Sequence, residues 1–320
     1  MDFLYNNFIS DLFVNALNGI HGWGLTYAVA IIILTVIIRF VLFPLDKRQR
    51  DNSKKMAALG PELQSIQKRY ANDPQRMQQK QQELYRKMGV NPFMGCLPAL
   101  IQLPIWFAFF GAMRILQTDQ MISMLLGASH YGTQAVSLPS MLWVHNFWQP
   151  DSGFYSILPN TQDFLGFVQS NASYISPQIL SMLQTQGLIS FQTGAITVND
   201  AVYTPMANEI VANAGLAGFS NGWFILPALS GLSLFLQQKF GGFSDLGAAG
   251  GAGPQTQGQP GGKFMMYFFP LFSVVICLTS PASFALYWTI SSAYAFGQAK
   301  LVDYISKKRA KSKEIAVQNK

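Results

Sequence analysis

The sequence predicts an all-α integral membrane protein, a helical bundle that crosses the bilayer five times. Half of the 320 residues are hydrophobic and only 12% are charged, whereas soluble domains carry about 25% charged residues. The stretches 23–45, 93–116, 223–238 and 264–299 contain only Arg39 and Arg114 as charged residues. A helix needs roughly 20 apolar residues to cross a bilayer core. These stretches are therefore the predicted spans.

The basic residues are segregated along the chain, and this predicts the orientation. Residues 47–87 hold eleven lysines and arginines and residues 307–320 hold six, but none lies before Arg39 or between Ile115 and Gln238. Under the positive-inside rule the basic segments are cytoplasmic. We therefore expect a multi-pass protein with its N-terminus outside and its C-terminus in the cytoplasm. Since no basic region precedes the first apolar run, we expect no secretory signal peptide of the usual form.

The N-terminal third predicts three elements. Residues 1–22 suit an amphipathic helix at the outer interface, and residues 23–45 form the first span. Residues 46–92 predict a cytoplasmic helical hairpin, because Met56, Leu59 and Leu63 recur at helical spacing and Asp73-Pro74 offers an N-cap followed by an N1 proline. A solvated connector is the plainer alternative for this segment.

The remaining elements follow in order. Residues 93–116 form the second span, 117–222 an external insertion of unassigned structure, and 223–238 a third span of only about 24 Å. Residues 239–263 read as a flexible cytoplasmic loop because they are rich in glycine. Residues 264–300 predict the fourth and fifth spans as a hairpin split at Ser280-Pro281, since one helix would run about 50 Å. Residues 301–320 form a basic cytoplasmic tail.

The sequence predicts no enzyme, metal site or cofactor. His21, His130 and His145 lie outside the predicted spans, and no hydrolase, metalloprotease or phosphate-binding motif occurs. Cys96 and Cys277 lie in apolar runs without paired spacing, which favours buried thiols over a metal or redox pair. Ser230-Gly231 reads as a pair of small residues at a helix contact rather than as a nucleophile. An intramembrane enzyme is therefore disfavoured.

Arg39 is the residue that most needs a reason. An arginine within a span costs roughly 2.5–3.5 kcal/mol on insertion scales and usually faces protein or a water-filled cavity. Thr35 lies four residues earlier and shares its helix face. The alternative is snorkelling, because the headgroups begin about 9 Å along the helix. For Gln102 and Gln237 the plainer alternative is a hydrogen bond between helices, and for Trp288 it is an interfacial or packing role.

Four segments resemble the core spans of the YidC/Oxa/Alb family of membrane protein insertases. They are "ILTVIIRFVLFPLDKRQ", "NPFMGCLPALIQLPIWFAFF", "FILPALSGLSLFLQQK" and "MMYFFPLFSVVICLTSPASFALYW". The resemblance implies a bacterial plasma (inner) membrane protein of the short type, without a large periplasmic domain. It also implies an intramembrane hydrophilic groove that opens to the cytoplasm and the lipid and is closed outside. The long external insertion departs from the family core.

The resemblance also implies roles for individual residues. The groove residues it implies are Arg39, Thr35, Gln102, Gln237, Tyr287 and Trp288. Trp106 and Ile276 would lie on a hydrophobic slide along which an apolar segment leaves sideways into lipid. The expected activity is insertion of nascent membrane proteins, in which Arg39 attracts the acidic tail that must cross.

The basic tail is expected to dock partners. Its candidate docking residues are Lys307, Lys308, Arg309, Lys311 and Lys313. They would meet the rRNA phosphates of a ribosome, although anionic lipid presents the same chemistry and a solvated tail is the plainer alternative. The Sec translocon and the lipid bilayer are the other expected partners. A rival of another class is a small-solute or anion transporter with Arg39 as its anion site, but no inverted repeat is evident.

Overall fold

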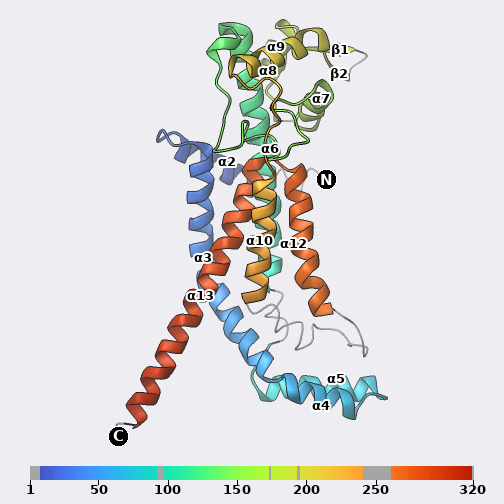
Figure 1. The fold of residues 1–320 in the computed structure, drawn as a ribbon. Coiled ribbons are helices and arrows are strands. Elements are labelled where there is room, and N and C mark those ends of the chain that lie inside the picture. Colours follow the sequence, from blue (N-terminus) through green and yellow to red (C-terminus); the bar gives the residue numbers. More distant parts are fainter. Residues whose placement is uncertain (1–7, 92–96, 173, 193–194, 241–260, 319–320) are drawn as a thin grey trace. The chain divides into compact units, whose positions relative to one another are not determined.

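The computed structural model describes residues 8–91, 97–172, 174–192, 195–240 and 261–318 (Figure 1). They fold into two compact units. Unit 1 comprises Met1–Ile32, Ile105–Ala228 and Val275–Tyr287, and unit 2 comprises Ile33–Pro104, Leu229–Val274 and Trp288–Lys320. The elements in chain order are α2 (Phe8–His21), α3 (Tyr27–Ala58), α4 (Gly60–Arg69), α5 (Pro74–Lys87), α6 (Leu97–Tyr131), the 3₁₀ turn η2 (Thr133–Ala135), α7 (Thr161–Ser170), α8 (Pro177–Thr185), β1 (Ile189–Gln192), β2 (Ala195–Val198), α9 (Asp200–Asn213), α10 (Ile225–Phe240), α12 (Gly261–Thr279) and α13 (Ala282–Gln318).

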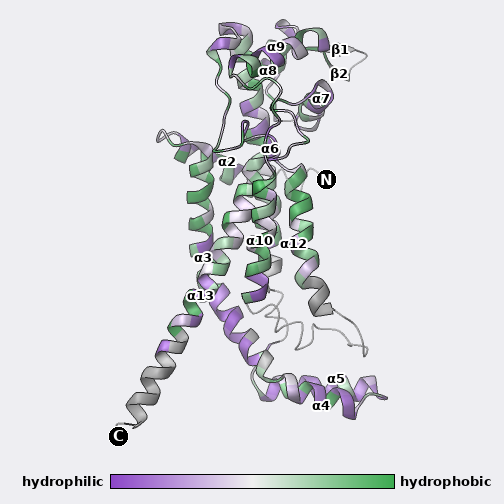
Figure 2. Ribbon diagram, in the orientation of Figure 1, coloured by the Kyte–Doolittle hydropathy of each residue, from purple (hydrophilic) through white to green (hydrophobic). Residues whose placement is uncertain are grey.

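The chain is mostly helical, as predicted. Within the described ranges, Tyr27–Met56 of α3 is long and apolar enough to cross a membrane, and Met266–Thr279 of α12 is a shorter apolar stretch. Figure 2 shows the change from hydrophobic to hydrophilic residues along α3. Helix α12 ends at Thr279 and α13 begins at Ala282, so Ser280-Pro281 separates the two helices. The five-span arrangement stays a prediction.

Helix α2 is amphipathic, as its sequence predicts. Its buried residues are Ser10, Phe13, Leu17 and Ile20, whereas Phe8 and Leu12 are exposed. Phe13 packs against Phe109 of α6, with ring centroids 5.7 Å apart. A helix with one buried stripe therefore still presents large apolar side chains outward.

Helices α4 and α5 pack against each other within unit 2. Met56, Leu59 and Leu63 are buried together with Val90, which confirms the predicted apolar seam. Asp73 caps α5 as predicted, because its side chain accepts a hydrogen bond from the Arg76 backbone N–H at 3.0 Å. The seam and the cap explain why a strongly polar segment is helical.

The insertion between the second and third predicted spans is folded. Helix α6 continues to Tyr131, so it delivers residues into a core that α7, α8, the β1–β2 hairpin and α9 complete. The two strands pair antiparallel, from Ile189 opposite Val198 to Gln192 opposite Ala195. Within this core the Phe164 and Tyr203 rings stack, with their centroids 4.8 Å apart. Its fifteen buried residues form one hydrophobic core within unit 1.

A buried aspartate fixes the start of α10. Asp151 has no exposed surface and accepts hydrogen bonds from the backbone N–H groups of Trp223 (2.8 Å) and Leu226 (2.6 Å) and from the Trp143 indole (2.9 Å). The first N–H groups of a helix lack partners within the helix, and a carboxylate there is favourable. Asp151 therefore joins the insertion to the start of α10 with two charge-assisted hydrogen bonds, and the third holds Trp143 within the insertion.

The residues just before Asp151 bind two further helices. We call residues 146–151 the bracket. The Ala282 and Ser283 N–H groups at the start of α13 donate to the carbonyls of Gln149 (3.0 Å) and Phe147 (3.1 Å). The Gln117 side chain of α6 donates to the Trp148 carbonyl at 2.6 Å. The bracket thus connects α6, α10 and α13 within unit 1.

Small residues allow α10 and α12 to approach closely in unit 2. A Cβ atom added at Gly231 would lie 2.5 Å from Val274 Cγ2 and 3.2 Å from the Pro270 carbonyl. Beside it, the Ser273 hydroxyl donates to the Ser230 hydroxyl at 3.1 Å. This confirms that Ser230-Gly231 packs helices together.

Gly222→Ala is expected to destabilise the protein, because the new Cβ would lie 2.1 Å from Asp151 Oδ1 and 2.8 Å from Asp151 Cα. Overpacking of this kind costs about 1–3 kcal/mol. The measurement is the midpoint of thermal unfolding in detergent. Gly166→Ala in α7 is the control, because nothing lies within 4 Å of its added Cβ. Equal midpoints for the two variants would contradict a tight bracket.

Candidate functional site

Arg39 is hydrogen-bonded to Ser291 in unit 2. The Arg39 guanidinium is half-buried on α3, and its Nε donates to the Ser291 hydroxyl oxygen at 2.8 Å. Its Nη2 donates to the same oxygen. Ser291 is buried on α13. A guanidinium has five N–H donors, so these two bonds fix its position and leave donors for another acceptor.

The partner of Arg39 is a neutral group. Ion pairs among the described residues join Arg50 and Lys54 to Asp303, Arg76 to Asp73, and Lys80 to Glu83. None of these pairs involves Arg39. A hydroxyl supplies hydrogen bonds without cancelling charge, so Ser291 does not neutralise Arg39.

Polar contacts continue along α3 and α13 beyond the Arg39–Ser291 contact. Gln298 approaches Asp46 at 3.4 Å, and Asp303 accepts from Lys54 at 2.7 Å and from Arg50 at 3.5 Å. On α3 these positions lie four or seven residues apart and so share one helix face, and on α13 Ser291 and Gln298 lie seven residues apart, with Asp303 five residues further on. The two helices are therefore joined by a polar track that begins at Arg39.

The other groove candidates of unit 2 are mostly half-buried. Thr35 is buried one turn before Arg39, and Gln102, Gln237 and Trp288 are half-buried. The contact that the structure describes for Arg39 is with Ser291, which sequence reasoning missed. Ser291 lies three residues after Trp288, so helical spacing from a candidate already named was the signal that pointed to it.

Three predicted residues lie in unit 1. Tyr287 is buried, and its ring stacks on Phe109 at 3.9 Å. Trp106 packs edge-on against Phe284 at 5.8 Å. Ile276 is half-buried in α12. Trp106 and Tyr287 belong to an aromatic cluster with Phe109 and Phe284, which suits an apolar wall better than a polar lining.

The candidate docking residues of the tail are less fully described. Helix α13 runs to Gln318, and Lys308 is exposed. The side chains of Lys307, Arg309, Lys311 and Lys313 lie outside the described part of the chain. Most of the predicted flexible loop, 241–260, also lies outside it.

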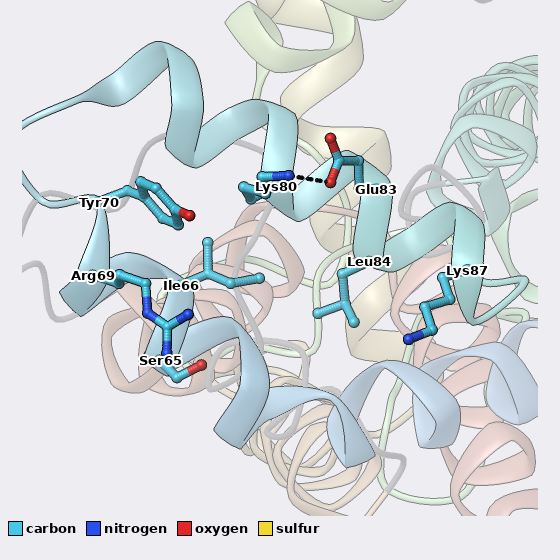
Figure 3. A pocket seen from close by; sticks show the side chains of 8 residues that line it. All are labelled: Ser65, Ile66, Arg69, Tyr70, Lys80, Glu83, Leu84 and Lys87. Atoms are coloured by element: carbon cyan, nitrogen blue, oxygen red, sulfur yellow. Dashed lines mark hydrogen bonds and ion pairs between the residues drawn. The ribbon is translucent and has the colours of Figure 1, made fainter.

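A described pocket lies away from Arg39, between α4 and α5 (Figure 3). Its volume is about 240 Å³, and it is lined by Ser65, Ile66, Arg69, Tyr70, Lys80, Glu83, Leu84 and Lys87. Lys80 donates to Glu83 at 2.6 Å, and this hydrogen bond raises the pKa of the Lys80 ammonium group. The pocket does not test the groove, which stays a proposal.

The histidines of the described chain lie against aromatic rings. Across residues 8–91, 97–172, 174–192, 195–240 and 261–318, His, Cys, Asp and Glu form no group of three or more suited to a metal. His21 stacks on Tyr27 at 4.0 Å, and His145 packs against Phe219 at 6.1 Å. Cys277 is a buried free thiol.

Residues 19–310 match the family described as "60Kd inner membrane protein". The chain belongs to this family. Three proteins named as membrane protein insertases are similar to it. YidC of Clostridium perfringens is 30% identical over 60% of this chain and 73% of its own length. YidC of Fusobacterium nucleatum is 28% identical over 92% of this chain and 94% of its own length. MisCA of Bacillus subtilis is 25% identical over 87% of this chain and 71% of its own length.

The Arg39–Ser291 hydrogen bonds are expected to contribute to stability. Ser291→Ala should lower the free energy of unfolding by about 1–3 kcal/mol, because it removes the acceptor of a half-buried cation. In an Arg39→Leu background, Ser291→Ala should lower the free energy of unfolding by much less. Thermal unfolding of the four proteins in the double-mutant cycle measures the difference. Additive effects would show that the contact is energetically unimportant.

Proposed function

We propose that this chain is a membrane protein insertase that acts on nascent membrane proteins in the bacterial inner membrane. Membership of the 60Kd inner membrane protein family and the names of the similar proteins support the activity. Insertases of this family are not enzymes, which agrees with the predicted lack of catalytic residues. The observation that carries the mechanism is a cation within an apolar helix, held by a neutral hydroxyl.

Arg39 acts as a counter-charge for the part of the substrate that crosses. A short acidic tail must lose its water to pass through lipid, and an unpaired carboxylate is costly there. The spare donors of Arg39 replace that water with charge-assisted hydrogen bonds. Thr35, Gln102 and Gln237 supply further polar contacts in a groove that is open to the cytoplasm and closed outside. The tail is thus stabilised for part of its path.

The apolar part of the substrate leaves sideways. Trp106 and Ile276 border the slide, whereas Tyr287 and Trp288 are proposed groove residues. Burial of apolar surface in lipid yields about 25 cal/mol per Å². Lateral release therefore drives the reaction without a catalysed chemical step.

Five spans place the basic segments in the cytoplasm. The α4–α5 hairpin and the tail after Leu301 then lie inside, and the folded insertion lies outside. The hairpin is the first part of the protein to meet substrates or partners. The tail docks a ribosome through Lys307, Lys308, Arg309, Lys311 and Lys313, and the Sec translocon is a further partner.

Arg39→Ala is expected to reduce insertion of a substrate with an acidic translocated tail, and Arg39→Lys should retain part of the activity because it keeps the charge. The measurement is protease protection of a short membrane protein made in the presence of proteoliposomes. A substrate with a neutral tail is the control and should depend less on Arg39. Equal insertion of the acidic substrate by all three proteins would reject the counter-charge. Solute flux into the same vesicles would instead favour a transporter.

Replacing the five docking residues of the tail with glutamine is expected to weaken ribosome binding. Each lost phosphate contact also reduces the salt dependence of the affinity. Co-sedimentation of ribosomes with proteoliposomes, measured over a range of salt concentrations, tests this. For a charge-matched control, replacing Lys307 and Lys308 is compared with replacing Lys239 and Lys263, because each variant loses two positive charges and the second pair lies outside the tail and the hairpin. A tail variant with unchanged affinity and salt dependence would exclude the tail as the docking site.

A further inference from the structure

The insertion carries a set of large apolar side chains that its own core leaves uncovered. Leu142 is 84% exposed, Phe154 86% and Trp223 66%, and Phe219 is also exposed. They belong to residues 139–158 and 219–226, which we call the collar. Four large apolar side chains gathered on two short segments need a partner, whereas single exposed ones do not.

The two collar segments are bonded into one structure within unit 1. The His145 N–H donates to the Asn221 carbonyl at 3.1 Å, and the Asn221 N–H donates to the Tyr155 carbonyl at 2.9 Å. The buried Asn146 and Asn221 side chains add three hydrogen bonds to backbone groups of Ile157, Asn146 and Pro150. Buried side-chain hydrogen bonds from both segments to backbone carbonyls hold the backbone rigidly. The exposed side chains are therefore held in place.

The backbone adopts unfavourable conformations in order to present these groups. Leu142 has φ 52° and Phe224 has φ 64°, and they are the only non-glycine residues with positive φ in the described part of the chain. Leu142 lies at the tip of a tight turn. Two backbone hydrogen bonds close this turn, from the Met141 N–H to the Val144 carbonyl and from the Val144 N–H to the Met141 carbonyl, each 2.9 Å long. Glycine or asparagine would suit that position better. Strain at an exposed leucine indicates that the side chain has a use outside the core.

We propose that the collar is a membrane anchor that inserts into the headgroup–acyl boundary of the outer leaflet. Trp and Phe prefer this boundary. The collar runs directly into α10, because Trp223 lies two residues before Ile225 and both are exposed. No lysine or arginine occurs between Ile115 and Gln238, so the collar offers no cation to an acidic partner. Continuity with an apolar span thus favours lipid over a protein partner.

An anchored collar fixes the depth of α10. The Asp151 hydrogen bonds to Trp223 and Leu226 join the collar rigidly to the start of this helix. Helix α10 has sixteen residues, or about 24 Å, and is shorter than a typical hydrocarbon core. If its outer end is held at the boundary, the short helix cannot slide, so the lipid beside it must thin. The inference rests on the proposed membrane topology and not on the insertase activity.

The test measures depth directly. Leu142→Cys and Phe154→Cys are made singly in a Cys96→Ser, Cys277→Ser background, labelled with an environment-sensitive fluorophore and reconstituted into phosphatidylcholine–phosphatidylglycerol vesicles. Met182→Cys on α8 is the control, because Met182 is an exposed apolar residue of the same unit outside the collar. The expected result is blue-shifted emission at both collar sites and quenching by spin-labelled lipids that exceeds the quenching at Met182→Cys.

Water-like emission at both collar sites would overturn the anchor, and in that case crosslinking of the collar to a protein in native membranes would identify a protein partner instead. Circular dichroism and thermal unfolding of each labelled variant show whether it is folded, and the second site keeps the test decisive if one variant is not. Labelling of Met182→Cys by a membrane-impermeant thiol reagent in intact cells tests the topology separately. Failure of insertion assays would leave the depth result unchanged, so the two proposals fail independently.

Discussion

A charged side chain in an apolar helix is costly unless polar groups or water lie beside it, and this constraint governs the Arg39 region. The Ser291 hydroxyl satisfies two donors of Arg39 without neutralising it. A carboxylate in that position would stabilise the cation more strongly and would also compete with any acidic substrate. A hydroxyl is therefore the better partner for an arginine whose charge must remain usable.

Each unit uses polar groups differently. In unit 1 the bracket, which includes Asp151, forms buried hydrogen bonds to backbone N–H groups at the starts of α10 and α13. In unit 2 the polar track between α3 and α13 is built from longer, partly exposed side chains that end in the ion pairs of Asp303. Buried backbone bonds are hard to exchange, whereas partly exposed ion pairs are weak and exchange easily. The contacts of unit 1 are therefore the more rigid ones, and those of unit 2 are the more exchangeable ones.

Local signals predicted the parts of the fold that depend on near neighbours. The Asp73 cap, the Met56–Leu63 seam and the small pair at Ser230-Gly231 each follow from spacings of a few residues, and the structure confirms them. Ser291 and Asp151 were missed because their partners lie 252 and 72 positions away. The insertion was unassigned because its elements are short, and its core forms only when α6 and α7–α9 meet. Helical spacing from Trp288 could have pointed to Ser291, but no local period could name Arg39 as its partner.

The short third span connects these observations physically. Gly231 lets α10 pack against α12 with almost no side-chain volume between them. A helix held this closely and capped by a buried carboxylate has little freedom to tilt or slide in order to match a thicker bilayer. The lipid is then the softer component, and deforming it costs only fractions of a kcal/mol per Å of mismatch. In the proposed mechanism, each ångström of thinning would shorten the dry path of a crossing tail, whose desolvation is far more costly. A rigid, short helix would then convert a small lipid deformation into a larger reduction of the barrier to insertion.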